Sequence, residues 1–164
     1  MIQTERLILR EYSINDAPFV FELMNSEGWL KNIGDRNIKS IEEAESYLEK
    51  NYLSNYKKYG YGPFLVSLKE DGTPIGSSGL YKRESLDFPD IGFAFLSQFF
   101  NQGYAFEASM AVMKYAKETL KLQTITGITL PTNASSIKLL KKLGLSEVGL
   151  FTYENGEELL LFSN

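Results

Sequence analysis

Hydrophobic and polar positions follow two different periods along this chain, and the period predicts the secondary structure of each segment. Alternating patterns and short apolar runs predict strands at 7–12, 63–68, 74–84, 90–96, 123–130, 146–153 and 158–162. Apolar residues that recur every three or four positions predict helices at 14–26, 41–59, 104–120 and 134–143. Gly28 closes the first helical segment, which leaves Trp29 in a loop.

The order of these segments is β-α-α-β-β-β-α-β-α-β-β, and turn signals support the boundaries. Ser40–Glu43 has the spacing of a capping box, and Asn155-Gly156 is a strong hairpin signal. The strand at 90–96, the helix after it and the strand at 123–130 form a βαβ unit, so the two strands are parallel if they are neighbours. We therefore predict an α+β (mixed α/β) fold with a mixed sheet of about seven strands and about four helices.

Composition narrows the classes of function. A chain of 164 residues with 43% apolar residues suits a single domain, 1–164, with one substantial core. The net charge of -4 argues against a broad basic face for nucleic acid. No apolar run is long enough to cross a membrane, and the N-terminus lacks the pattern of a signal peptide. We expect a cytoplasmic protein with neither nucleic acid nor membrane as a partner.

The chain contains no cysteine and no histidine. This excludes thiolate nucleophiles, disulfides, the usual zinc sites and a Ser-His-Asp triad. Asp and Glu are not clustered densely enough for a carboxylate-only magnesium site, so no metal is expected. Catalysis would have to use Asp, Glu, Tyr, Ser, Lys or backbone groups.

One stretch, Asp90–Ala108, combines a predicted strand, a short polar turn and the start of a helix. Gly103 closes the turn directly before the helix. Such a turn leaves several backbone N–H groups unpaired, with the positive end of the helix dipole behind them. The stretch therefore predicts a site for an anionic group such as a pyrophosphate.

Two motifs and the N-terminal segment resemble the GNAT superfamily of acyl-CoA-dependent N-acetyltransferases. Gln98–Gly103 is similar to the family's coenzyme motif, Gln/Arg-x-x-Gly-x-Gly/Ala, with Asn101 in place of the first glycine. Asn is the non-glycine residue that best tolerates a left-handed backbone. Asn133–Leu145 is similar to the family's Asn-x-x-Ser/Ala helix, and Thr4–Arg10 resembles the opening of the RimJ/RimL-like branch of ribosomal-protein N-terminal acetyltransferases.

The resemblance implies that acetyl-CoA is the co-substrate and implies where it binds. The turn amides would hold the pyrophosphate, the backbone at the end of the strand at 90–96 would pair with the pantetheine arm, and the later helix would form the second wall. The residues implied are Phe95, Leu96, Ser97, Asn101, Gln102, Gly103, Tyr104, Ala105, Asn133 and Ser136. A lysine cluster, Lys138, Lys141 and Lys142, is either a contact for the coenzyme's 3′-phosphate or a solvated helix face.

The resemblance also implies catalytic roles. Asp90 is a candidate general base that acts through water, or else a strand-end charge, and Glu84 is a second candidate. The tyrosine that acts as general acid in many members is absent, because Leu140 occupies its position. Ser136 matches the acid of the RimL-like branch, or else it only caps its helix. A backbone N–H near Leu96 is the expected donor to the oxyanion.

The function implied is transfer of acetyl from acetyl-CoA to a primary amine, by direct attack in a ternary complex. The acceptor is either a protein N-terminus or a small amine. The alternative is a non-catalytic acyl-CoA-binding regulator. Trp29 and the tyrosines between 47 and 61 are expected in packing, with a role in the acceptor site as the alternative. The oligomeric state stays open, with a homodimer as one alternative.

Overall fold

A computed structural model describes residues 1–164 and has an eight-stranded sheet at its centre. The strands are β1 (Ile2–Gln3), β2 (Leu7–Glu11), β3 (Pro63–Leu68), β4 (Pro74–Tyr81), β5 (Asp90–Phe95), β6 (Thr126–Thr129), β7 (Ser146–Thr152) and β8 (Glu158–Ser163). The helical segments are η1 (Ile14–Asp16), α1 (Ala17–Met24), α2 (Glu27–Asn32), α3 (Ile41–Tyr47), the π-helical η2 (Leu48–Leu53), α4 (Ser54–Tyr59), η3 (Ser97–Phe99), α5 (Tyr104–Glu118) and α6 (Ala134–Lys142).

The strand order across the sheet is β1-β2-β3-β4-β5-β6-β8-β7. All neighbouring strands are antiparallel except β5 and β6, which are parallel. This confirms the mixed sheet and the parallel βαβ unit predicted from the sequence. The sheet has one strand more than expected, because β1 adds two residues to its edge, too few to show an alternating pattern.

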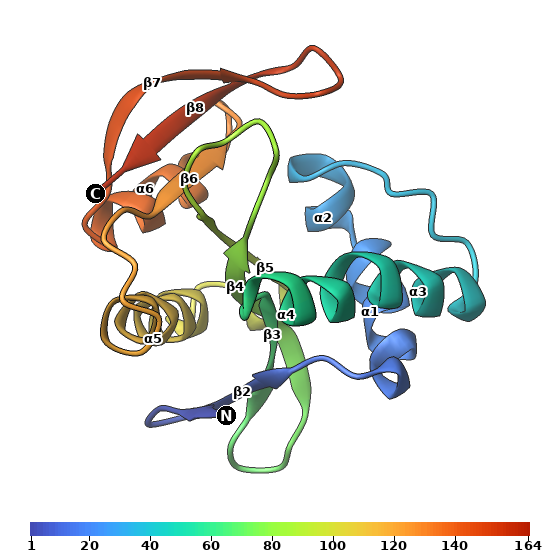
Figure 1. Ribbon diagram of the computed structural model, residues 1–164. Coiled ribbons are helices and arrows are strands. Elements are labelled where there is room, and N and C mark those ends of the chain that lie inside the picture. The colour runs from blue at the N-terminus through green and yellow to red at the C-terminus, as the bar shows by residue number, and fades with distance from the viewer.

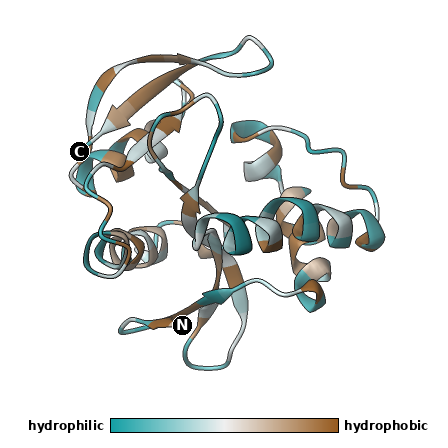
Figure 2. Ribbon diagram, viewed as in Figure 1, coloured by the Kyte–Doolittle hydropathy of each residue, from teal (hydrophilic) through white to brown (hydrophobic).

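Helices cover both faces of the sheet. Figure 1 shows α5 and α6 on one side of the strands, and α1, α2 and α3 on the other. The first interface buries side chains such as Val112 and Phe162, and the second buries Val20 and Leu48. In Figure 2 the loop between β4 and β5 and the tip of the β7–β8 hairpin are hydrophilic. None of the helices is both long and apolar enough to span a membrane.

The segment around Gly28 differs from the prediction. Gly28 and Trp29 lie inside α2, and the Trp29 side chain is buried against the second core. Ser26 is extended just before the helix, and Glu27 places a negative charge in its first turn. Glycine inside a helix costs only about 1 kcal/mol relative to alanine, which burial of the indole outweighs.

Candidate active site

The parallel strands β5 and β6 separate almost as soon as they meet. They pair only at Asp90 and Thr126, the first residue of each strand, whereas β5 pairs with β4 along its whole length. The positions in the middle of β5, 92–94, are partly exposed although the strand is central in the sheet. The two strands therefore diverge toward their carboxyl ends, and the region between them is called the crevice below. Open α/β sheets bind ligands at the carboxyl ends of their strands.

Backbone hydrogen bonding decides which groups of β5 face this crevice. The Leu96 N–H donates to the carbonyl oxygen of Ile75 at 3.0 Å, so it is directed toward β4. Backbone groups alternate between the two edges of a strand, so those of Phe93 and Phe95 point toward β6, where pairing has ended. The Leu96 N–H is therefore not available to an oxyanion, and among the donors near Leu96 the Phe95 N–H lies on the free edge of β5.

The polar turn after β5 has the backbone that an anion site requires. Asn101 and Gly103 both have left-handed conformations, with φ of +60° and +81°. Asn101 therefore adopts the conformation for which the family uses glycine, as predicted. The first hydrogen bond of α5 runs from the Glu107 N–H to the Gly103 carbonyl, so the amides of Tyr104 and Ala105 have no helical partner.

The second arm of the crevice, β6, leads into α6. Asn133 caps this helix, because its side-chain oxygen accepts a hydrogen bond from the Ser136 N–H at 3.2 Å. The capping role considered for Ser136 thus belongs to Asn133. Ser136 is buried, and no hydrogen bond within the chain engages its hydroxyl. Leu140 packs over Gly127, where an added Cβ would lie 2.7 Å from a leucine methyl group, so the position of the family's tyrosine is a core position here.

Asp90 lies at the closed end of the crevice and is almost completely buried, at 1% exposure. The Arg83 Nε donates to its Oδ1 at 3.0 Å, and an Arg83 Nη1 donates to the Tyr153 hydroxyl at 3.3 Å. The guanidinium also lies over the rings of Tyr81 and Tyr153. Burial raises the pKa of Asp90, and the charge of Arg83 offsets part of that rise. The result is a carboxyl with a raised pKa beside a fixed cation. Glu84, the second candidate, is exposed.

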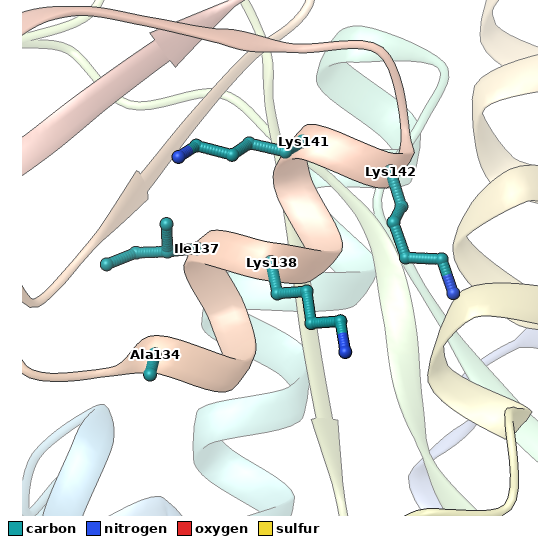
Figure 3. Close-up of a pocket in the computed structure, with 5 residues that line it drawn as sticks. All are labelled: Ala134, Ile137, Lys138, Lys141 and Lys142. Atoms are coloured by element: carbon teal, nitrogen blue, oxygen red, sulfur yellow. The ribbon is translucent and has the colours of Figure 1, made fainter.

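Two of the three lysines of α6 point toward α5. In Figure 3 Lys138 and Lys142 extend to the same side of the helix, and Lys141 extends to the opposite side. The three lysines, with Ala134 and Ile137, line a hollow of about 500 Å³. The Lys142 ammonium lies 4.5 Å from the centre of the Phe106 ring, in the first turn of α5. Positive charge is therefore placed next to the anion-binding turn.

Most of the phenols that were candidates for the acceptor site are packing residues. Tyr12, Tyr47 and Tyr81 surround the ring of Tyr52, with centroids 5.1 to 6.4 Å apart. Tyr12 and Tyr52 are buried, which agrees with the packing interpretation. Sequence reasoning did not find Arg83 as the partner of Asp90, or Tyr153 as the second partner of Arg83. The two lie 70 positions apart, and no local pattern links them.

Comparison with known proteins identifies this arrangement. The family model described as the acetyltransferase (GNAT) domain matches residues 6–146, which is most of the chain. The chain belongs to the GNAT acetyltransferase family. YnaD of Bacillus subtilis, an uncharacterised N-acetyltransferase, is 30% identical over 150 residues, which cover 92% of this chain and 85% of YnaD. This GNAT acetyltransferase is accordingly an acyltransferase enzyme.

Solved structures support the same assignment. The GNAT-family acetyltransferase of Bacillus anthracis is 26% identical and superimposes with a TM-score of 0.80, covering 99% of this chain and 96% of that one. RimL, a ribosomal protein acetyltransferase in complex with coenzyme A, is 17% identical and has a TM-score of 0.83, covering 98% and 94%. The predicted GNAT fold is therefore confirmed.

Proposed function

We propose that this acetyltransferase moves acetyl from acetyl-CoA to a primary amine inside the crevice between β5 and β6. The observation that carries the proposal is the single pairing of these strands at Asp90 and Thr126, after which each strand leads to the N-terminus of a helix. Unpaired amides at the start of α5, and the helix dipoles of both arms, favour an anionic ligand held across the opening. A pyrophosphate with an amide-bearing arm matches that shape and polarity.

In this proposal each part of the coenzyme meets a different element. The pyrophosphate lies on the turn, where Gln102, Gly103, Tyr104 and Ala105 supply amides and Asn101 sets the direction of the chain. The pantetheine amides pair with the free edge of β5, chiefly through Phe95. Leu96 and Ser97 were expected to pair with the arm. The free edge of β5 does so instead in this proposal, because the Leu96 N–H is bonded to β4. Asn133 and Ser136 contact the arm from the second wall.

The coenzyme's 3′-phosphate fits the lysine pair on α6. Lys138 and Lys142 extend toward the first turn of α5, whereas Lys141 points away. A phosphate that ends next to both lysines gains charge-assisted hydrogen bonds without moving either helix. This assigns the lysine cluster to the coenzyme and divides it into two contacting residues and one solvated residue.

Acetyl transfer proceeds by direct attack of a neutral amine on the thioester carbonyl. Asp90 takes up the amine's proton through water, and its raised pKa suits this role. A backbone N–H on the free edge of β5 that the pantetheine arm leaves unpaired stabilises the oxyanion. The carbon–sulfur bond then breaks, and the hydroxyl of Ser136, which no group of the chain engages, protonates the departing thiolate. No enzyme nucleophile is needed, which agrees with the absence of cysteine and histidine.

The acceptor in this proposal is a protein N-terminus or a small amine. The Thr4–Arg10 segment supports membership of the RimJ/RimL-like branch, whose members modify protein N-termini. The catalytic unit is the single domain 1–164. Glu154 and Glu157 lie at the tip of the β7–β8 hairpin, which also carries Tyr153. Their negative charges favour a cationic acceptor.

Turnover with a panel of amines tests the proposal. The panel contains peptides with free N-termini, a polyamine, free amino acids and an aminoglycoside, and release of coenzyme A thiol is followed for each. We expect thiol release to depend on at least one of these amines, because the crevice holds both a base and an acid. Coenzyme binding without thiol release for every amine would instead support the acyl-CoA-binding regulator.

A further inference from the structure

The segment before β2 reaches across the molecule to the anion-binding turn. Arg6 Nη1 donates to the Gln102 carbonyl oxygen at 2.9 Å, and the Arg6 guanidinium lies 4.3 Å from the centre of the Tyr104 ring. A Cβ added to Gly103 would lie 3.3 Å from Arg6 Nη2. One side chain therefore contacts three successive residues of the turn, although it is almost a hundred positions away in the sequence.

Glu107 holds Arg6 in this position. Its Oε1 accepts from the Thr4 hydroxyl at 2.6 Å and from the Arg6 N–H at 2.8 Å, and its Oε2 accepts from Arg6 Nε at 2.7 Å. Burial raises the pKa of Glu107, but these hydrogen bonds outweigh it and hold that pKa below its ordinary value. The carboxylate thus stays charged at neutral pH, and the planar guanidinium is fixed by one bond at Nε and another at Nη1.

This contact determines where the turn amides point. The carbonyl and the following N–H of a trans peptide lie in one plane and point in opposite directions. Because the Gln102 carbonyl is directed at Arg6, the Gly103 N–H is directed away from Arg6, toward the opposite side of the turn. The only other side-chain hydrogen bond of Gln102 runs to the Gln98 carbonyl oxygen, and Gly103, with no side chain and a left-handed backbone, does not restrict the peptide by itself.

We infer that Arg6 is a positioning residue for coenzyme binding, which orients the Gly103 amide toward the pyrophosphate through the Gln102 carbonyl. The inference rests on the proposed function for the identity of the anion. Arg6 itself contacts the rear of the turn, so its effect is on affinity for the coenzyme and not on the acetyl-transfer step. Thr4 and Glu107 act only by holding Arg6.

Lysine cannot replace Arg6 in this role. The arginine makes the Glu107 bond and the Gln102 bond at the same time because its donors are spaced along a rigid plane. A lysine ammonium is a single point at the end of a flexible chain and reaches one partner at a time. Arg6→Lys therefore keeps the positive charge but no longer orients the Gln102 peptide. The variant thus separates the effect of peptide orientation from electrostatic attraction of the coenzyme.

Arg10 provides a matched control for Arg6. It is exposed to a similar extent, with 44% of its side chain accessible against 41% for Arg6, and it also pairs with a carboxylate, Asp16, at 2.8 Å. Its contacts lie within β2 and the residues after it, and none involves the turn. Arg10→Ala thus removes a comparable ion pair without affecting the proposed function of Arg6.

The test measures coenzyme A affinity by calorimetry and amide hydrogen exchange of the free protein by NMR, for the parent, Arg6→Ala, Arg6→Lys and Arg10→Ala. We expect both Arg6 variants to bind about tenfold more weakly, since an oriented hydrogen bond to a charged group is lost. We also expect faster exchange at Gly103 and Tyr104, an increased KM for acetyl-CoA and an unchanged kcat. Arg10→Ala should match the parent in every measurement.

Three results would overturn the inference: exchange at Gly103 that does not change in Arg6→Ala, faster exchange with coenzyme affinity within twofold of the parent, or an equal loss in Arg10→Ala. If Arg6→Ala does not fold, the same measurements on Arg6→Lys decide the inference. A parent protein that does not bind coenzyme A would contradict the proposed function instead. The exchange data would then still report whether Arg6 orders the turn.

Discussion

At the scale of single residues, the sequence identified the groups of the active site better than it identified their partners. Asn101 was recognised as a substitute for glycine, and its φ of +60° shows why asparagine suits the position. Asp90 was recognised as a candidate general base or a strand-end charge, but its surroundings were not predicted. Its burial and its bond to Arg83 depend on a loop and a hairpin that meet only in the folded chain.

The same limit applies to the backbone donor near the end of β5. The sequence placed it near Leu96 without fixing the residue, and the register between β4 and β5 directs the Leu96 N–H to Ile75 and leaves the groups of Phe95 free. A shift of one residue along a strand reverses the direction of its backbone groups, and a strand pattern alone does not fix the register.

Ser136→Ala tests the proposed general acid. Loss of the hydroxyl should lower kcat by about 100-fold, because a positioned acid or base contributes 10²–10⁴-fold. Steady-state release of coenzyme A thiol measures the effect, and thermal unfolding checks that the fold is retained. Ser135→Ala is the matched control, since Ser135 is the exposed neighbour on the same helix turn. A Ser136→Ala variant with full turnover would exclude Ser136 as the acid.

At the scale of secondary-structure elements, strongly patterned segments were predicted well and segments fixed by tertiary contacts were not. The helix at Ala134–Lys142 and the strand at Pro63–Leu68 agree with the predictions almost to the residue. The strand expected at 123–130 is shorter, Thr126–Thr129, because β5 turns away and leaves its ends without a partner on that side. Burial of Trp29 extends helical structure through Gly28, which local signals marked as a stop.

Asn133 caps α6 and is proposed to contact the coenzyme, and substitution can separate these two roles. Asn133→Ala should lower the free energy of unfolding by about 1 kcal/mol through loss of the N-cap bond to Ser136. Asn133→Ser keeps a capping oxygen, so its stability should return to near that of the parent. A serine is too short to reach the pantetheine arm, so the KM for acetyl-CoA should stay raised.

Urea unfolding and steady-state kinetics on both Asn133 variants give these two quantities. Full recovery of the acetyl-CoA KM in Asn133→Ser would show that Asn133 acts only as a helix cap. The proposed contact with the coenzyme would then be withdrawn, while the cap would stand.

At the scale of the whole molecule, the fold class could be predicted because the order of strands and helices is visible in the sequence. The strand patterns alone do not predict the separation of β5 from β6, since neither segment differs in pattern from a strand that pairs fully, and only the family resemblance implies it. The separation is what converts a continuous sheet into a crevice. In the proposed function, it also allows two motifs far apart in the sequence, at Gln98–Gly103 and Asn133–Leu145, to contact one ligand.

The contacts of Arg6 with the turn are a second property of the whole molecule. The sequence showed only that the N-terminal segment resembles a family branch. In the structure, Thr4 and Arg6 of this segment bind Glu107 in α5, and Arg6 also binds the turn before α5. The connection between the edge strand β1 and its neighbour β2 thereby contacts the proposed ligand site, although both strands lie far across the sheet from β6.

The structure of the complex with coenzyme A tests the central claim most directly. Our account predicts the pyrophosphate within hydrogen-bond distance of the Gly103 and Ala105 amides, and the pantetheine arm along the free edge of β5 between Phe93 and Phe95. Lys138 and Lys142 should then lie next to the 3′-phosphate, with Lys141 pointing away. A coenzyme bound outside the crevice between β5 and β6 would contradict the account.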